Sequence, residues 1–388
     1  ALLCAMADLL MADVSDILAA NRRDLDAAEE NGVPKAMMDR LKLDEKRLGG
    51  ICDALREVAA LPDPIGSGER TVRPNGLVIQ HVRAPLGCVA IIYEARPNVT
   101  VDAAALCLKT GNAVVLRGGK EAVHSGTALV DSMKKALIAN GFSPDLIGFI
   151  AKTDRAGANA LMDMRRYVDV LMPRGGKGLI RAVVENARVP VIETGAGNCH
   201  LYVDESADLN MAVKVAVNAK CSRPSVCNAV ECVLVHEAIA KDFWEKALPL
   251  LDHHNVELRC DAKALDIVGS RGIPASEEDW DTEYDDYILA VRTVGGMDEA
   301  IDFINAHSTQ HSEAIITRNY FKAQHFLNAV DAAAVYVNAS TRFTDGNVFG
   351  LGAEIGISTQ KLHARGPMGL TALTTVKYLI NGDGQCRT

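Results

Sequence analysis

Apolar residues recur at helical spacing through the first sixty positions of the chain. Residues 2–14 repeat Leu, Met and Val every three or four positions, which predicts a helix that buries one face. The Asn, Gly and Pro residues within 31–34 are typical of a helix end. A second amphipathic pattern covers about 41–61 and stops at the two prolines of 62–64. The N-terminal part is therefore predicted to be helical.

Strand patterns follow. Residues 71–80 predict a hairpin that turns at Asn75-Gly76. From residue 85, short apolar runs alternate with helical segments, with strands at 88–93, 113–116, 146–150, 168–172 and 189–192 and helices at 101–109, 121–140, 156–164 and 177–187. Strand–helix–strand repetition predicts a parallel sheet with right-handed crossovers. Ligands of such sheets bind beyond the carboxyl ends of the strands.

A second α/β pattern begins near residue 200. A strand at 200–203 and a helix at 208–220 lead through a turn-rich loop at 221–228 into a strand at 230–235. The acidic stretch 271–286 is predicted to be a loop. Further strands are expected at 287–294, 314–317, 334–337 and, near the C-terminus, 374–380. The fold class is therefore α/β throughout.

Charge and composition exclude some classes of partner. The 41 basic and 50 acidic residues give a net charge of −9, which argues against a nucleic acid as the main partner. The longest stretch without a charged residue, 366–376, is far shorter than the roughly 20 residues of a membrane span. No basic-then-apolar leader appears at the start of the sequence, so a cytoplasmic protein with reduced thiols is expected.

Ten cysteines need an explanation. The one cluster, Cys221, Cys227, Cys232 and His236, has wider gaps than structural zinc sites prefer, and no metal is expected. Most cysteines lie in apolar runs, as small buried hydrophobes do. Cys227 follows Ser222-Arg223-Pro224-Ser225-Val226 between a helix and a strand, where a thiol can be exposed. The residues alone leave it open as a nucleophile or a buried structural thiol.

Three strand ends carry further candidate chemistry. Asn98 follows the strand at 88–93 and can donate to an oxyanion, or Asn98 or Thr100 can cap the next helix. The other two ends are basic Gly-Gly turns, Arg117-Gly118-Gly119-Lys120 and Arg174-Gly175-Gly176-Lys177. Backbone N–H groups and cations at such turns can bind phosphate, although each is also an ordinary tight turn.

Taken in order, these segments resemble the aldehyde dehydrogenase superfamily over the whole chain. Residues 85–98 resemble its strand leading to the oxyanion Asn, and 113–120 its ribose-binding strand and turn. Its Glu-Leu-Gly-Gly-Lys motif would fall at 193–197, and its nucleophile at Cys227. Glu283 resembles the Glu that contacts the nicotinamide ribose, or is one more solvated acid.

The resemblance is closer to one branch of that superfamily, the γ-glutamyl phosphate reductases. It rests on Tyr-Glu-Ala-Arg-Pro-Asn-Val-Thr at 93–100, on Asn-Ala-Lys at 218–220 with Arg-Pro-Ser-x-Cys-Asn at 223–228, and on the strings 349–354 and 361–370. The branch implies reduction of L-glutamyl 5-phosphate by NADPH to L-glutamate 5-semialdehyde, with release of phosphate, in proline biosynthesis. The alternatives are a CoA-acylating or hydrolytic branch, or a catalytically silent NADP-binding relative.

The resemblance also assigns roles. Cys227 is the expected nucleophile that forms a thioester, Asn98 the oxyanion donor, and Glu193 a relic of the base, a cofactor contact or a proton relay. NADP(H) is expected to bind Arg117, Gly118, Gly119, Lys120, Arg174, Gly175, Gly176 and Glu283. A cation in place of the acid of NAD-preferring relatives suits a 2′-phosphate. The expected substrate contacts are Phe349, in the late pocket segment 337–350, and the cations Arg96, Arg223 and Arg342, with Arg365 a further candidate.

The implied architecture is a Rossmann-type cofactor domain at 1–198, with a bridging hairpin at about 68–83, an α/β catalytic domain at 199–365, and a C-terminal segment at 366–388 that returns to the first domain. The hairpin and the strand at 374–380 imply a homodimer or homotetramer. A contact with glutamate 5-kinase is also expected, as is the possibility that the chain is one module of a kinase–reductase fusion.

Overall fold

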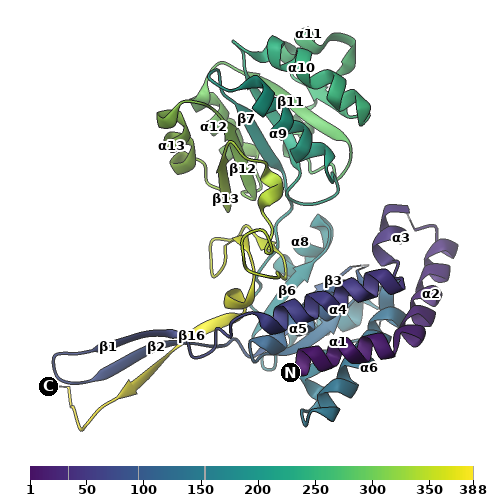
Figure 1. Ribbon diagram of the computed structural model, residues 1–388, viewed down its shortest axis with the longest axis vertical. Helices are drawn as coiled ribbons and strands as arrows, with labels where there is room; N and C mark the ends of the chain where they lie inside the picture. Colours follow the sequence, from purple (N-terminus) through teal and green to yellow (C-terminus); the bar gives the residue numbers. More distant parts are fainter. Residues whose placement is uncertain (34, 95, 153, 388) are drawn as a thin grey trace. The chain divides into compact units, whose positions relative to one another are not determined.

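The computed structural model describes residues 1–33, 35–94, 96–152 and 154–387 (Figure 1). The chain forms two compact units. Unit 1 comprises Ala1–Thr194, Gly350–Gly356 and Met368–Thr388, and unit 2 comprises Gly195–Phe349 and Ile357–Pro367. Both are α/β, as the sequence predicts. Among the described residues, no helix is both long and apolar enough to cross a membrane.

The N-terminal helices of unit 1 confirm the helical prediction but are more divided than expected. They are α1 (Leu2–Ala12), α2 (Val14–Glu30), α3 (Lys35–Leu41) and α4 (Glu45–Ala60). The break between α1 and α2 falls at Asp13. Asp44 caps α4, because its carboxylate accepts the Arg47 backbone N–H at 2.8 Å.

A parallel sheet forms the centre of unit 1, in the strand order β5-β4-β3-β6. Its strands are β3 (Cys88–Tyr93), β4 (Ala113–Arg117), β5 (Ile147–Phe149) and β6 (Val170–Arg174), and its helices are α5 (Pro97–Lys109), α6 (Val123–Ala139), α7 (Arg155–Asp163) and α8 (Lys177–Asn186). The strand predicted at 189–192 is wrong. Only an isolated bridge joins Leu171 to Val191, since Pro190 has no N–H for a ladder.

Three antiparallel strands form an arm of unit 1: β1 (Gly68–Val72), β2 (Val78–Pro85) and β16 (Thr374–Asn381), with β2 in the middle. The hairpin predicted at Asn75-Gly76 is confirmed. Gly76 has φ +84°, a backbone region that glycine enters at little cost, and the Asn75 side chain accepts the Leu77 N–H at 3.2 Å. Figure 1 shows these strands extending as a long ribbon from the helices of unit 1.

Unit 2 contains a seven-stranded parallel sheet, ordered β10-β9-β11-β8-β7-β12-β13. The strands are β7 (Cys199–Val203), β8 (Val230–His236), β9 (Glu257–Cys260), β10 (Gly272–Pro274), β11 (Ile288–Val294), β12 (Ser312–Ile316) and β13 (Ala334–Val337). The loop predicted at 271–286 in fact contains β10 and a 3₁₀ turn at Glu277–Asp281. The short pair β14 (Ile357–Ser358) and β15 (Gly366–Pro367) is separate from this sheet.

Helices cover both faces of the unit 2 sheet. They are α9 (Leu209–Cys221), α10 (Ala240–His253), α11 (Ala262–Val268), α12 (Met297–His307) and α13 (Tyr320–Ala329). Because successive strand residues point to opposite faces, Leu201, Val233 and Val291 pack with α9, α10 and α11, whereas Tyr202, Leu234 and Ala290 pack with α12 and α13. A core on both faces explains why the strands are almost continuously apolar.

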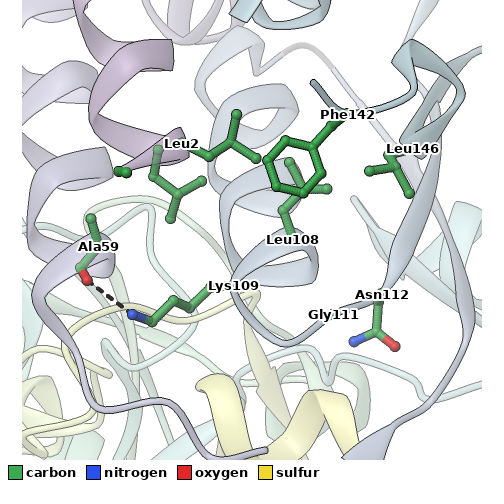
Figure 2. Close-up of a pocket in the computed structure, with 10 residues that line it drawn as sticks. Leu2, Ala59, Leu108, Lys109, Gly111, Asn112, Phe142 and Leu146 are labelled. Atoms are coloured by element: carbon green, nitrogen blue, oxygen red, sulfur yellow. Dashed lines mark hydrogen bonds between the residues drawn. The ribbon is translucent and has the colours of Figure 1, made fainter. Parts of the chain in front are cut away.

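An apolar pocket of about 330 Å³ lies in unit 1 between the start of α1 and the ends of α4 and α5. Figure 2 shows Leu2, Leu108, Phe142 and Leu146 around it, with Lys109 bonded to the Ala59 carbonyl at 2.9 Å. None of the residues predicted for catalysis or ligand binding lines this pocket.

Asp24 of α2 fixes the beginning of α6. The Asp24 carboxylate accepts the backbone N–H groups of His124 at 3.1 Å and Ser125 at 2.7 Å, and the Ser125 hydroxyl at 2.6 Å. Asp24 is 1% exposed, so water cannot replace it. Asp24 therefore accepts N–H groups at the start of α6 that have no partner within the helix. This helix follows the turn at Arg117–Lys120.

Replacement of Asp24 by Ala should lower the urea midpoint of unfolding markedly. The change leaves buried donors unpaired, at a cost of about 2–4 kcal/mol. Asp26→Ala on the same helix is the control, because Asp26 is exposed and should change the midpoint little. Equal midpoints for the two variants would contradict the capping role of Asp24.

Candidate functional site

Cys227 lies in a turn-rich loop between the end of α9 at Cys221 and the start of β8 at Val230. Its side chain is partly exposed, whereas Cys199, Cys221 and Cys232 nearby in the fold are buried. The ten cysteines all fall within the described residues, and none is part of a disulfide. Nor do the described residues contain a group of three or more His, Cys, Asp or Glu side chains suited to a metal ion.

The segment 340–344 holds this loop through Asn228. The Asn228 amide donates to the backbone carbonyls of Arg342 at 3.3 Å and Thr344 at 2.9 Å. The Thr341 hydroxyl donates to the Asn228 carbonyl at 2.7 Å, and the Arg342 guanidinium donates to the Asn228 side-chain oxygen. Asn228 is 5% exposed, so these bonds fix the residue next to Cys227.

Arg342 also contacts the other end of the loop. Its Nε donates to the Ser222 hydroxyl at 3.1 Å. Burial and then the neighbouring Arg223 guanidinium lower the pKa of Arg342, while the charges of Cys227 and Asp345 act in the opposite direction. Two guanidinium groups and the Cys227 sulfur therefore share one region of unit 2, and Arg223 is exposed there.

Gly197 packs directly against Cys227. A Cβ atom on Gly197 would lie 1.5 Å from the Cys227 carbonyl oxygen, so only glycine fits. The Gly197 N–H donates to the Glu283 carboxylate at 2.7 Å, and the Cys199 thiol donates to the Cys227 carbonyl at 3.2 Å. Burial raises the pKa of Cys199 well above its ordinary value, which keeps it a neutral thiol.

His311 lies behind Cys199. Its Nδ1 is 3.7 Å from the Cys199 sulfur and 2.8 Å from the Ser312 hydroxyl. Burial lowers the pKa of His311 to about 4, so its ring is neutral at physiological pH. The Cys199 thiol and the His311 ring, which lie behind the Cys227 backbone, are therefore both uncharged.

In unit 1, Asn98 is the second residue of α5 and is exposed. The helix begins at Pro97, not at 101 as expected, because proline suits the first helical position. Asn98 does not cap the helix. Its amide donates to Asp102 one turn later at 3.1 Å, and Thr100 bonds with the Tyr93 hydroxyl at 2.6 Å. Burial raises the pKa of Asp102 to about 6, against the lowering effects of Asn98 and Arg174.

The two basic Gly-Gly turns lie at the carboxyl ends of β4 and β6, as predicted. At the start of the helix that follows each turn, a protein carboxylate already accepts backbone N–H groups. Asp24 accepts at the start of α6, and Glu94 accepts the Gly176 N–H at 2.9 Å before α8. Lys120 is exposed, and Arg117 reaches the Asp154 carbonyl at 3.3 Å.

The remaining predicted residues occupy varied positions. Arg96 precedes α5, and Glu193 lies in the extended segment after α8, both partly exposed in unit 1. Phe349 is 44% exposed and is the last residue of the segment Gly195–Phe349 of unit 2. Arg365, whose side chain is 24% exposed, forms an ion pair with Asp331 at 2.8 Å.

The chain is similar to known proteins in its sequence and in its structure. A family model described as the aldehyde dehydrogenase family matches residues 8–264. A γ-glutamyl phosphate reductase of Enterococcus faecalis is 55% identical over 388 residues, which cover 100% of this chain and 93% of that protein. One of Carboxydothermus hydrogenoformans is 57% identical over 384 residues, covering 98% and 92% respectively.

The chain belongs to the γ-glutamyl phosphate reductases of the aldehyde dehydrogenase family. The crystal structure of the Thermotoga maritima γ-glutamyl phosphate reductase matches with a TM-score of 0.97 at 48% identity, over 100% of this chain and 94% of that one. The resemblance inferred from the sequence motifs, the α/β fold and the enzyme class are thereby confirmed.

Within this reductase, unit 2 brings together Cys227, Arg223, Arg342 and, through Gly197, Glu283. The sequence does not predict the contacts that hold these residues in place. In the sequence, Gly197 stands out only as part of a motif, and Asn228 only as the neighbour of Cys227. Asp102, the partner of Asn98, is not predicted either. Its spacing of four residues on a helix is a usable signal, since such side chains share one face.

Replacement of Gly197 by Ala should displace the Cys227 backbone, because the added methyl group and the Cys227 carbonyl cannot occupy the same space. A displacement of about 1 Å at a nucleophile can cost about 100-fold in turnover. We expect a loss of that order in kcat and a changed rate of Cys227 alkylation by iodoacetamide. Gly178→Ala is the control, since a methyl group there would have nothing within 4 Å. Wild-type kcat in Gly197→Ala would contradict the close packing.

Proposed function

We propose that this chain reduces L-glutamyl 5-phosphate to L-glutamate 5-semialdehyde with NADPH and releases phosphate, a step of proline biosynthesis. The main support is the similarity to a γ-glutamyl phosphate reductase, which is 55% identical over the full chain. The partly exposed thiol of Cys227, in a loop fixed from both sides and beside two arginines, supports the proposal from the side of chemistry.

The proposed reaction begins at Cys227. Its thiolate attacks the acyl carbon of the substrate, the bond from that carbon to the phosphate oxygen breaks, and phosphate leaves. The product of this step is a thioester on Cys227. When bound, NADPH supplies the hydride that reduces the thioester. The carbon–sulfur bond then breaks, so that the aldehyde leaves and the Cys227 thiolate is regenerated.

The proposed oxyanion donors are the Cys227 backbone N–H and Asn98. Asn98 is kept in this role on the family resemblance. Its side chain is suited to it, because the amide has two N–H groups and the bond to Asp102 uses one. Exclusion of water from the site would prevent hydrolysis of the thioester. Glu193 is kept only as a candidate proton relay or cofactor contact.

Arg223 and Arg342 are the proposed ligands of the substrate phosphate. They lie close enough for Arg223 to lower the pKa of Arg342, and an anion between them would relieve that repulsion. Arg342 is already held by Ser222 and Asn228, whereas Arg223 is exposed and can turn toward a ligand. Arg96 and Phe349 remain proposed contacts for the rest of the substrate.

The turn after β4 fits a 2′-phosphate through its side chains. Lys120 is exposed at the turn, and Arg117 lies at the end of the strand. Gly118 lies close to Tyr93, since a methyl group there would be 3.3 Å from the Tyr93 ring. Since Asp24 caps the helix that follows, Lys120 and Arg117 would supply the contacts at this turn, with the turn Arg174–Gly176 and Glu283 as further proposed contacts of NADP(H).

The arm of β1, β2 and β16 is the proposed surface for a homodimer or homotetramer. Its outer strands expose apolar side chains, including Val72 at 54%, Tyr378 at 62% and Ile380 at 59%. Unpaired strand edges and exposed apolar groups both favour contact with another chain. The contact with glutamate 5-kinase stays a prediction. Because Cys227 must stay reduced to react, we also keep the cytoplasm as the proposed location.

Replacement of Cys227 by Ala should abolish NADPH formation from glutamate 5-semialdehyde, NADP⁺ and phosphate, because no thioester can form. We expect a fall of at least about 1,000-fold in kcat, followed by absorbance of NADPH. Cys386→Ala is the control, since Cys386 is an exposed thiol outside this loop. Near-wild-type turnover in Cys227→Ala would exclude the covalent route.

Replacement of Lys120 by Glu should weaken NADP⁺ binding about 10-fold or more and leave NAD⁺ binding less affected, because only NADP⁺ carries the 2′-phosphate. Dissociation constants from fluorescence titration measure both. Lys214→Glu, an exposed residue of α9, repeats the charge change away from the turn. Equal losses for NADP⁺ and NAD⁺ in Lys120→Glu would contradict the assignment.

A further inference from the structure

A fully buried ion pair spans the two ends of the Cys227 loop. Lys220 lies in the last turn of α9 and Glu231 is the second residue of β8. The Lys220 Nζ is 2.5 Å from the Glu231 Oε2, and the side chains are 0% and 1% exposed. Every residue between them, including Cys227 and Asn228, belongs to the loop or its attachment to α9 and β8.

The pair also contacts the segment that carries Glu283. The Lys220 Nζ lies 5.8 Å from the centre of the Tyr284 ring, a cation–π distance. The Tyr284 hydroxyl is fixed by a 2.8 Å bond to Asp279. Burial raises the pKa of the Glu231 carboxyl, and Lys220 and the Asp285 backbone N–H both act to lower it. Residues 284 and 285 therefore pack around the pair.

A continuous series of contacts connects the ion pair to the Cys227 backbone. From Lys220 and Glu231 the path runs through Tyr284 to Glu283, from the Glu283 carboxylate to the Gly197 N–H, and from Gly197 to the Cys227 backbone. The second Glu231 oxygen, Oε1, is buried without a hydrogen-bond partner. The carboxylate bonds to Lys220 through its other oxygen, and the pair gains little stability for its desolvation.

We propose that the Lys220–Glu231 pair is a positioning element. It fixes the position of the Cys227 loop relative to the Glu283 carboxylate. The statement about catalysis rests on the function proposed above. Neither residue needs to touch the substrate. A buried ion pair costs desolvation that apolar residues of similar volume avoid, so stability alone gives weak reason for it. Geometric specificity accounts for it better, because the charges accept only one arrangement of the two loop ends.

The decisive variant is Lys220→Met/Glu231→Met, which fills the same volume without a lone buried charge. If the pair positions the loop, this variant keeps a near-wild-type melting temperature but loses kcat by on the order of 10-fold, with KM changed less than about 3-fold. The rate of Cys227 alkylation by iodoacetamide should change by about 5-fold or more in the same variant.

Two further variants complete the test. Glu231→Gln keeps the shape and an acceptor for Lys220, so its kcat and alkylation rate should fall between those of the wild type and the double variant. Lys322→Met is the control, because it removes a 2.6 Å ion pair with buried Asp204 elsewhere in unit 2 and should leave Cys227 alkylation unchanged.

Wild-type kcat and alkylation in a folded double variant would overturn the proposal. If the double variant does not fold, wild-type values in Glu231→Gln would overturn it equally. Alkylation does not depend on the identity of the substrate. If the wild-type chain failed to turn over glutamate 5-semialdehyde, the proposed function would fall, while the alkylation rates would still judge the ion pair.

Discussion

The close approach of Gly197 to the Cys227 backbone is the constraint on which the candidate site depends. No side chain fits between them, so the segment entering β7 and the loop entering β8 must pass in direct contact. That contact fixes where the Gly197 N–H points, and hence where the Glu283 carboxylate binds. Asn228 and Arg342 hold the loop from the other side. These contacts hold Cys227 in place, as its proposed role as the nucleophile requires.

The two units differ in the charged groups that lie beside their sheets. In unit 2 the loops beside the sheet bring together the Cys227 thiol and two arginines, with Asp345 close to Arg342. In unit 1 the acids Asp24 and Glu94 satisfy backbone donors at the starts of α6 and α8. If the turn after β4 binds the cofactor as proposed, side chains such as Lys120 would supply the contacts, because Asp24 already occupies the start of α6.

Sequence patterns predicted the parallel sheets well, because buried parallel strands are short apolar runs between helices. They failed at 189–192, where Pro190 removes a ladder donor, and they left α10 to α13 undescribed. Cys227 and the arginines were recognised from long motifs. Asp102, Asn228 and the Lys220–Glu231 pair were not, since their roles come from contacts between residues whose importance no local period reveals.

The most direct measurement is the phosphate dependence of the oxidative reaction. Glutamate 5-semialdehyde and NADP⁺ are mixed with the wild-type chain, with and without inorganic phosphate, and NADPH absorbance is followed. A phosphorylating reductase must form NADPH only when phosphate is present to take the acyl group from Cys227. Equal rates without phosphate would contradict the account, and would point to water or another thiol as the acceptor.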